Sequence, residues 1–125
     1  MTQLYLIRHG QAYCNVRPFG LIAGMRGDAG LTPLGRTQAE HLRDRLIATG
    51  EIEADTLISS TLPRARQTAE IIAPAFALPI EFDDEVQEQR VGDLDGLPWE
   101  KVKDQLPNVW EEPFKPFGPS GENWG

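Results

Sequence analysis

Strand-like and helix-like patterns alternate along the chain as far as residue 82, and no other feature of the sequence restricts its fold as strongly. Leu4 to Ile7 form a compact apolar run, which predicts a buried and parallel strand. Residues 56–59 and 80–82 predict two more strands, the last of them weaker. This alternation predicts a three-layer α/β/α domain.

The first predicted helix has clear signals at both ends. Thr32 can cap its start, Pro33 suits the first helical position, and Gly50 follows its expected end at Thr49. Apolar residues at helical spacing predict its buried face: Leu34, Ala39, Leu42, Leu46 and Ile47.

The second predicted helix follows the strand at residues 56–59. Ser60 or Thr61 is expected to cap it, and Pro63 lies near its first turn. Pro74 cannot continue a helix, so the helix is expected to stop before that residue.

The composition is ordinary for a globular protein, with 40% hydrophobic and 25% charged residues. A net charge of −7 disfavours general binding to nucleic acid or to anionic membranes. No apolar run approaches the roughly 20 residues of a membrane helix. The start lacks the features of a secretory signal and Cys14 is the single cysteine, so a cytoplasmic location is expected.

The sequence changes character from Leu97 onward, where five of the ten prolines and all three tryptophans lie. Short helical turns are expected near 98–106 and 108–112, and the segment from Pro113 to Pro119 is predicted to be an ordered lid, a substrate loop or a linker. Ser120 has the character of a helix cap. We therefore expect residues 1–125 to be the N-terminal part of one domain, ending at the start of a helix.

Polar residues follow the first predicted strand at Arg8-His9-Gly10. Ligands of open α/β sheets bind at the carboxyl ends of strands. A neutral imidazole can attack phosphorus, and a neighbouring guanidinium can hold phosphate oxygens. Gly10 would let the backbone approach the phosphate. Taken alone, the three residues fit a structural histidine at a strand end slightly better.

Arg64 lies in the first turn of the second predicted helix, where backbone amides favour an anion. A cation at this end opposes the helix dipole, which suggests that it has a function. Arg66, two residues later, is interpreted as a residue of the solvated helix surface.

Glu88 is a candidate general acid toward a leaving oxygen and a candidate base for water. Eight carboxylates lie from Glu81 to Glu100, and most of them are expected to form a solvated acidic face. Spacing alone does not single out Glu88.

Five segments together resemble the histidine phosphatase superfamily, also called the phosphoglycerate mutase-like family. They lie at residues 6–15, 31–39, 59–69, 88–96 and 119–122, in the family's order. The resemblance implies an incomplete phosphoglycerate mutase-like sheet. It implies that His9 is phosphorylated, that Glu88 donates and accepts protons, and that Arg8, Asn15 and Arg64 bind phosphate. It implies no metal and no organic cofactor.

Two departures from the family pattern stand out. Asp95 occupies a position where the family often has glutamate. The family's second catalytic histidine follows a later strand, whereas His41, the chain's only other histidine, is expected on a helix surface. That later strand lies between the first two strands of the family's sheet. Its loss would leave a gap with exposed apolar faces, so we expect this piece alone to be marginal or inactive.

The leading hypothesis is a phosphatase that acts on a phosphorylated small molecule. A phosphoglycerate-type mutase is the nearest alternative, although residues 16–30 lack the Gly-Trp pair associated with glycolytic mutases. A non-catalytic short form that binds phosphorylated ligands is the third. The sequence identifies neither the substrate nor the oligomeric state. Candidates for lining a substrate site are Arg17, Arg26, Trp99, Trp110 and Phe117.

Overall fold

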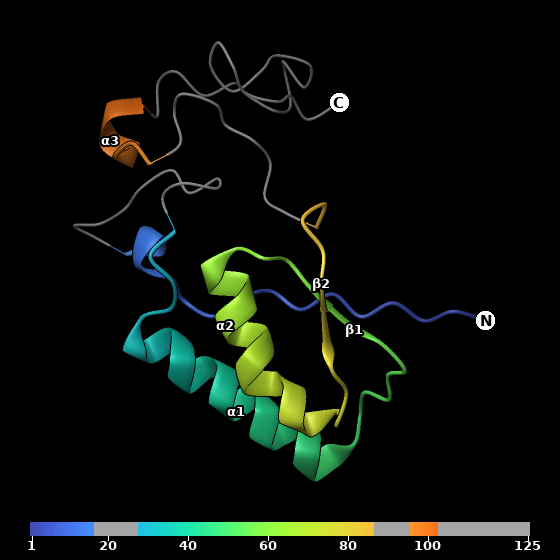
Figure 1. Cartoon of the computed structure of the whole chain (residues 1–125). Helices are drawn as coiled ribbons and strands as arrows, with labels where there is room; N and C mark the ends of the chain where they lie inside the picture. Colours follow the sequence, from blue (N-terminus) through green and yellow to red (C-terminus); the bar gives the residue numbers. More distant parts are fainter. Residues whose placement is uncertain (17–27, 87–95, 103–125) are drawn as a thin grey trace.

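A computed structural model describes residues 1–16, 28–86 and 96–102 of the chain. Two helices and two strands form its main body (Figure 1): α1 (Pro33–Thr49), β1 (Leu57–Ser59), α2 (Pro63–Ile72) and β2 (Ile80–Phe82). The shorter elements are η1 (Tyr13–Asn15), η2 (Ala73–Ala75) and α3 (Trp99–Val102). The turn predicted at 108–112 and the helix start predicted at Ser120 lie outside the described residues.

Helix α1 has the bounds that its end signals predict. The Thr32 hydroxyl accepts a hydrogen bond of 3.0 Å from the Gly35 N–H, and Gly50 ends the helix with a φ of 61°. Only part of the predicted apolar face is buried. Ala39 and Leu46 lie in the core, whereas Leu34 and Ile47 are 52% and 58% exposed.

Helix α2 begins at Pro63 and ends before Pro74, as predicted, but its cap differs from the prediction. Leu62 is the residue that precedes the helix, and its side chain caps nothing. Ser60 instead accepts a hydrogen bond from the Leu62 N–H at 3.2 Å, while Thr61 donates to Asp84 at 2.7 Å. The chain therefore turns into α2 through a serine turn, and neither Ser60 nor Thr61 caps the helix as the sequence predicted.

Strands β1 and β2 form a two-stranded parallel sheet with Leu57 opposite Ile80 and Ser59 opposite Phe82. Helix α2 packs against both α1 and β1 (Figure 1). Buried apolar residues of the two helices contribute to the core, namely Ala39, Leu46, Ala69 and Ile72. This arrangement is an α/β fold with an incomplete sheet. None of the helices in the described ranges is long and apolar enough to cross a membrane.

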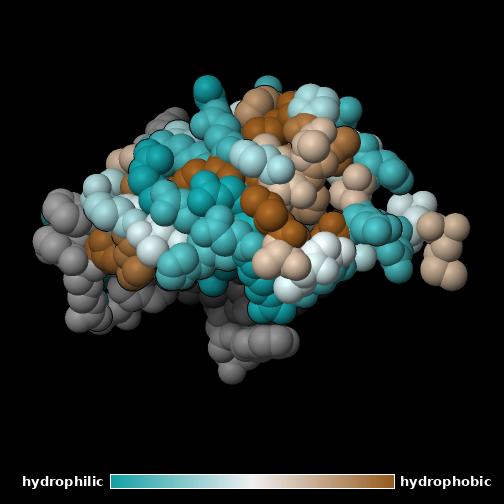
Figure 2. All heavy atoms as spheres, turned by 90° about the horizontal axis from the view of Figure 1, so that it is seen from below, coloured by the Kyte–Doolittle hydropathy of each residue, from teal (hydrophilic) through white to brown (hydrophobic). Residues whose placement is uncertain are grey.

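The prediction of a buried strand at Leu4–Ile7 is wrong for this structure. These residues form no strand, and Leu4 and Leu6 are 80% and 87% exposed. A strand needs a hydrogen-bonded neighbour, and the described sheet contains only β1 and β2. Ile58 and Phe82 on those strands are also about half exposed, and hydrophobic residues lie at the surface among hydrophilic ones in Figure 2. Exposed apolar side chains on an unfinished sheet agree with the gap that the sequence predicts.

The segment that follows Leu4–Ile7 packs tightly on α1 through two glycines. A Cβ atom added to Gly10 would overlap the carbonyl oxygen of Gly35, and one added to Gly35 would overlap the carbonyl oxygen of Gln11. Gly10 therefore permits a close approach between two stretches of backbone, where the sequence suggested an approach to phosphate.

Replacing Gly35 by alanine tests this contact. Alanine normally stabilises a helix interior by about 1 kcal/mol relative to glycine. Here we expect the opposite sign, a loss of about 1–3 kcal/mol in the free energy of unfolding, because the backbone of Gln11 must move. Urea unfolding measures the change, with His41→Ala on the exposed side of α1 as a control that should change little. A stabilised Gly35→Ala variant would show that the close contact does not exist.

Candidate active site

An open pocket of about 520 Å³ lies where the N-terminal segment meets α1. Six residues line it: Arg8, His9, Gly10, Gln11, Asn15 and Gln38. Three of them, Arg8, His9 and Asn15, are candidate site residues from the sequence. The pocket contains one guanidinium, one imidazole and three side-chain amides, and no carboxylate is among its lining residues.

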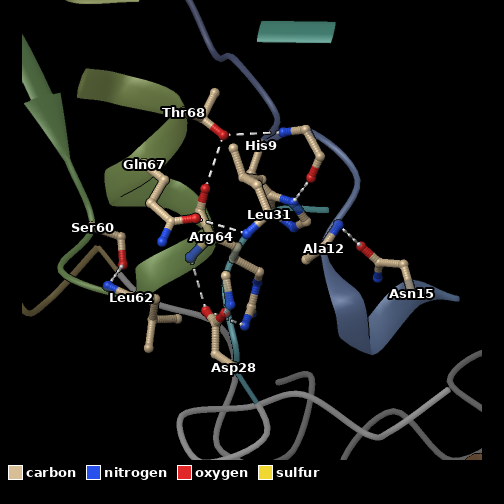
Figure 3. Close-up of polar contacts among 12 residues, drawn as sticks. His9, Ala12, Asn15, Asp28, Leu31, Ser60, Leu62, Arg64, Gln67 and Thr68 are labelled. Atoms are coloured by element: carbon tan, nitrogen blue, oxygen red, sulfur yellow. Dashed lines mark hydrogen bonds and ion pairs between the residues drawn. The ribbon is translucent and has the colours of Figure 1, made fainter. Parts of the chain in front are cut away.

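His9 is held by a short hydrogen bond between its Nδ1 atom and the carbonyl oxygen of Gly10, at 2.6 Å (Figure 3). A carbonyl oxygen only accepts, so this contact requires the proton to be on Nδ1. In the neutral ring, Nε2 then carries the free lone pair. The local backbone therefore selects the ring nitrogen that can act as a nucleophile.

Arg8 and Asn15 lie on either side of His9 in the sequence and share its pocket. The Arg8 guanidinium forms no ion pair or hydrogen bond within the described ranges of the chain, and it is exposed. Asn15 accepts a hydrogen bond from the Ala12 N–H at 3.0 Å through Oδ1, so its NH₂ group remains a donor. These groups suit an anionic ligand.

Arg64 has a different environment, because it is 4% exposed and is not among the residues that line this pocket. Its Nη1 atom pairs with Asp28 Oδ2 at 3.0 Å, and its backbone N–H donates to the same oxygen at 3.1 Å. The Asp28 side chain is 1% exposed and also accepts from the Gly30 N–H at 2.8 Å. A carboxylate of the chain itself thus lies at the N-terminus of α2, where the sequence suggested an anion.

One face of α2 supports the backbone next to the pocket. Its residues Arg64, Gln67 and Thr68 are three and four positions apart and therefore lie on the same side of the helix. Gln67 accepts from the Leu31 N–H at 2.7 Å (Figure 3). Thr68 accepts from the Gly10 N–H at 3.1 Å and donates to the Arg64 carbonyl at 2.8 Å. Together with Arg64, this α2 face fixes the backbone beside His9 and the segment that contains Asp28.

Further candidates lie outside the described residues, namely Glu88, Arg17, Arg26, Trp110 and Phe117. Trp99 begins α3, and its side chain is not described. His41 is exposed on α1, and Arg66 is exposed and pairs with Glu70 at 3.0 Å, both as interpreted from the sequence. Within the described ranges, no group of three or more histidine, cysteine or acidic residues is placed to hold a metal ion.

Sequence reasoning missed Asp28, Gln11 and Gln38. The pattern Asp28-Ala29-Gly30 is typical of an Asx-turn, which the Asp28–Gly30 hydrogen bond forms, and it could have predicted a local role for Asp28. Gln38 looks like an ordinary polar residue of a helix surface. Only the packing of α1 on the N-terminal segment brings it to His9.

The model of the histidine phosphatase superfamily (branch 1) matches residues 4–125. A 2,3-bisphosphoglycerate-dependent phosphoglycerate mutase of Bartonella quintana is 32% identical over 127 residues, covering 96% of this chain and 60% of the mutase.

Two solved phosphatase structures are also similar to the chain. A mycobacterial glucosyl-3-phosphoglycerate phosphatase has a TM-score of 0.69 and 26% identity, covering 92% of this chain and 53% of its own. A putative alpha-ribazole-5'-P phosphatase of Escherichia coli has a TM-score of 0.72 and 26% identity, covering 94% and 57%. The chain therefore spans between about half and three fifths of the length of these relatives.

Proposed function

The chain belongs to the histidine phosphatase superfamily, and from that premise we propose that the complete protein hydrolyses a phosphorylated small molecule through a phosphohistidine on His9. The hydrogen bond from His9 Nδ1 to the Gly10 carbonyl carries this proposal, because it leaves the Nε2 lone pair to attack. The donors of Arg8 and Asn15 in the same pocket suit the phosphate oxygens.

The proposed reaction has two steps. In the first, His9 Nε2 attacks phosphorus, the bond between phosphorus and the ester oxygen breaks, and Glu88 gives a proton to the leaving alcohol. In the second, Glu88 takes a proton from water as the water oxygen attacks phosphorus, and the nitrogen–phosphorus bond breaks to release phosphate. The family resemblance also assigns phosphate binding to Arg64, but in this structure its guanidinium pairs with the buried Asp28 carboxylate and Arg64 does not line the pocket, so the proposal draws its phosphate contacts from Arg8 and Asn15. The reaction is proposed to need no metal or organic cofactor.

Trapping the intermediate tests the proposal. The complete protein, exposed to radiolabelled 3-phosphoglycerate and quenched in alkali, is expected to carry a label that acid removes, as phosphohistidine does. A protein that turns the ester over without ever carrying label would contradict a covalent route.

A mutase is the second candidate, because the Bartonella quintana relative is named as one. It would return the phosphoryl group to another hydroxyl of the substrate instead of passing it to water. Measuring free phosphate against isomerised product from 3-phosphoglycerate separates the two, and we expect free phosphate.

A further inference from the structure

Three side-chain amides line the His9 pocket, and hydrogen bonds inside the chain engage the oxygen atom of each. The Gln38 oxygen accepts from the Gln11 N–H at 2.9 Å. The Asn15 oxygen accepts from the Ala12 N–H at 3.0 Å, and the Gln11 oxygen accepts from the Thr32 hydroxyl at 2.8 Å. All three amides are therefore oriented by the chain itself.

Their orientation makes the NH₂ groups available to a ligand as donors. A backbone N–H cannot accept, so the amide atom that faces it must be the oxygen, and the NH₂ group points elsewhere. This fixes the NH₂ groups of Gln38 and Asn15 as available donors. Within the described ranges, neither NH₂ group, nor that of Gln11, has a hydrogen-bond partner.

We propose that Gln38 is a further binding residue, which donates a hydrogen bond from Nε2 to the phosphate group in the His9 pocket. Gln38 comes from α1, while the other lining residues come from the N-terminal segment, so it reaches the ligand from a separate element. It adds a neutral donor beside the single positive charge of Arg8. This inference rests on the proposed function, because the ligand it names is the phosphate group that His9 would attack.

Gln38 also has an anchoring contact, since its oxygen holds the backbone of Gln11 next to the pocket. A test must separate this contact from phosphate binding. Gln38→Glu does so, because a carboxylate keeps the acceptor for the Gln11 N–H and the side-chain length, but loses the NH₂ donor. Gln38→Met loses both groups at similar length.

The measurement is the dissociation constant of inorganic phosphate for the complete protein, by titration calorimetry. Gln38→Met is expected to weaken phosphate binding about tenfold, which is the scale of a hydrogen bond to a charged group. Gln38→Glu is expected to weaken it more at neutral pH. As the pH falls and the introduced carboxyl takes up a proton, it regains a donor, so the ratio of its affinity to that of the parent should recover.

His41→Glu is the matched control for added charge, because residue 41 lies one turn further along the same helix and is not among the pocket residues. If Gln38→Glu weakens phosphate binding no more than His41→Glu does, Gln38 does not donate to phosphate and the inference is wrong. Should Gln38→Met not fold, the comparison of the two glutamate variants decides alone.

The outcomes separate this inference from the proposed function. If His9 carries label but the Gln38 variants bind phosphate as tightly as the parent protein, the inference is overturned and the proposed function is unaffected. Phosphate affinity that depends on Gln38, in a protein that never carries label, would support the inference and contradict the covalent route.

Discussion

The His9→Ala variant is expected to carry no phosphoryl label and to lose phosphatase activity about 10⁴-fold or more, the scale on which removal of a covalent nucleophile acts. This loss is expected because the Gly10 carbonyl fixes the proton on Nδ1 of His9 and leaves Nε2 as the attacking atom. None of the other residues lining the described pocket offers a nitrogen lone pair. The measurement is steady-state release of phosphate by the complete protein, alongside label trapped after a quench.

His41→Ala is the matched control, since it removes the chain's only other histidine from the exposed side of α1. It should keep both label and turnover. Label that persists in His9→Ala would place the phosphoryl group on another residue and would refute the assignment of His9. Melting curves for both variants show whether a loss of activity reflects a loss of fold.

The second large effect is expected from Asp28→Ala, which should lower the free energy of unfolding by about 3–5 kcal/mol. Asp28 and Arg64 are almost fully buried, and removing the carboxylate leaves the guanidinium charge without this partner. The N–H groups of Gly30 and Arg64 lose their acceptor at the same time. Urea unfolding, followed by circular dichroism, measures the change.

Glu70→Ala provides the comparison, because Glu70 pairs with Arg66 at the same distance of 3.0 Å but on the surface of the same helix. The Arg66 and Glu70 side chains are 60% and 49% exposed, so the loss is expected to be about 0.5 kcal/mol or less. Equal losses in the two variants would mean that the Asp28–Arg64 pair is not protected from water.

Local sequence signals were sufficient to predict the ends of the two long helices. Thr32, Pro33 and Gly50 act within one turn of the residues they direct, so the bounds of α1 followed from them. Pro74 ended α2 for the same reason. The apolar face of α1 was predicted less well, because Leu34 and Ile47 are buried only if something covers them, and nothing in the periodicity says what does.

The failure at Leu4–Ile7 has a physical cause. An apolar run indicates that a segment can form a strand, but a strand forms only where an adjacent strand supplies backbone hydrogen bonds. No such neighbour for this segment is among the described residues. The local pattern could not reveal that, whereas knowledge of the family's strand order could.

The candidate site was predictable where its residues are adjacent in sequence. Arg8, His9 and Asn15 lie within eight residues of one another and do share a pocket. Arg64 and Asp28 are 36 positions apart, and nothing in either segment predicts that they pair. The contribution of Gln38 depends on which side of α1 faces the N-terminal segment.

Helix α2 holds Gly10, Asp28 and Leu31 through the side chains of Thr68, Arg64 and Gln67, which lie on one face of the helix. The positions of these three residues therefore depend on the same helix. Fraying of the first two turns of α2 would release all three, because Arg64, Gln67 and Thr68 all lie within those turns. The order of the backbone beside His9 therefore depends on the stability of the first two turns of a ten-residue helix.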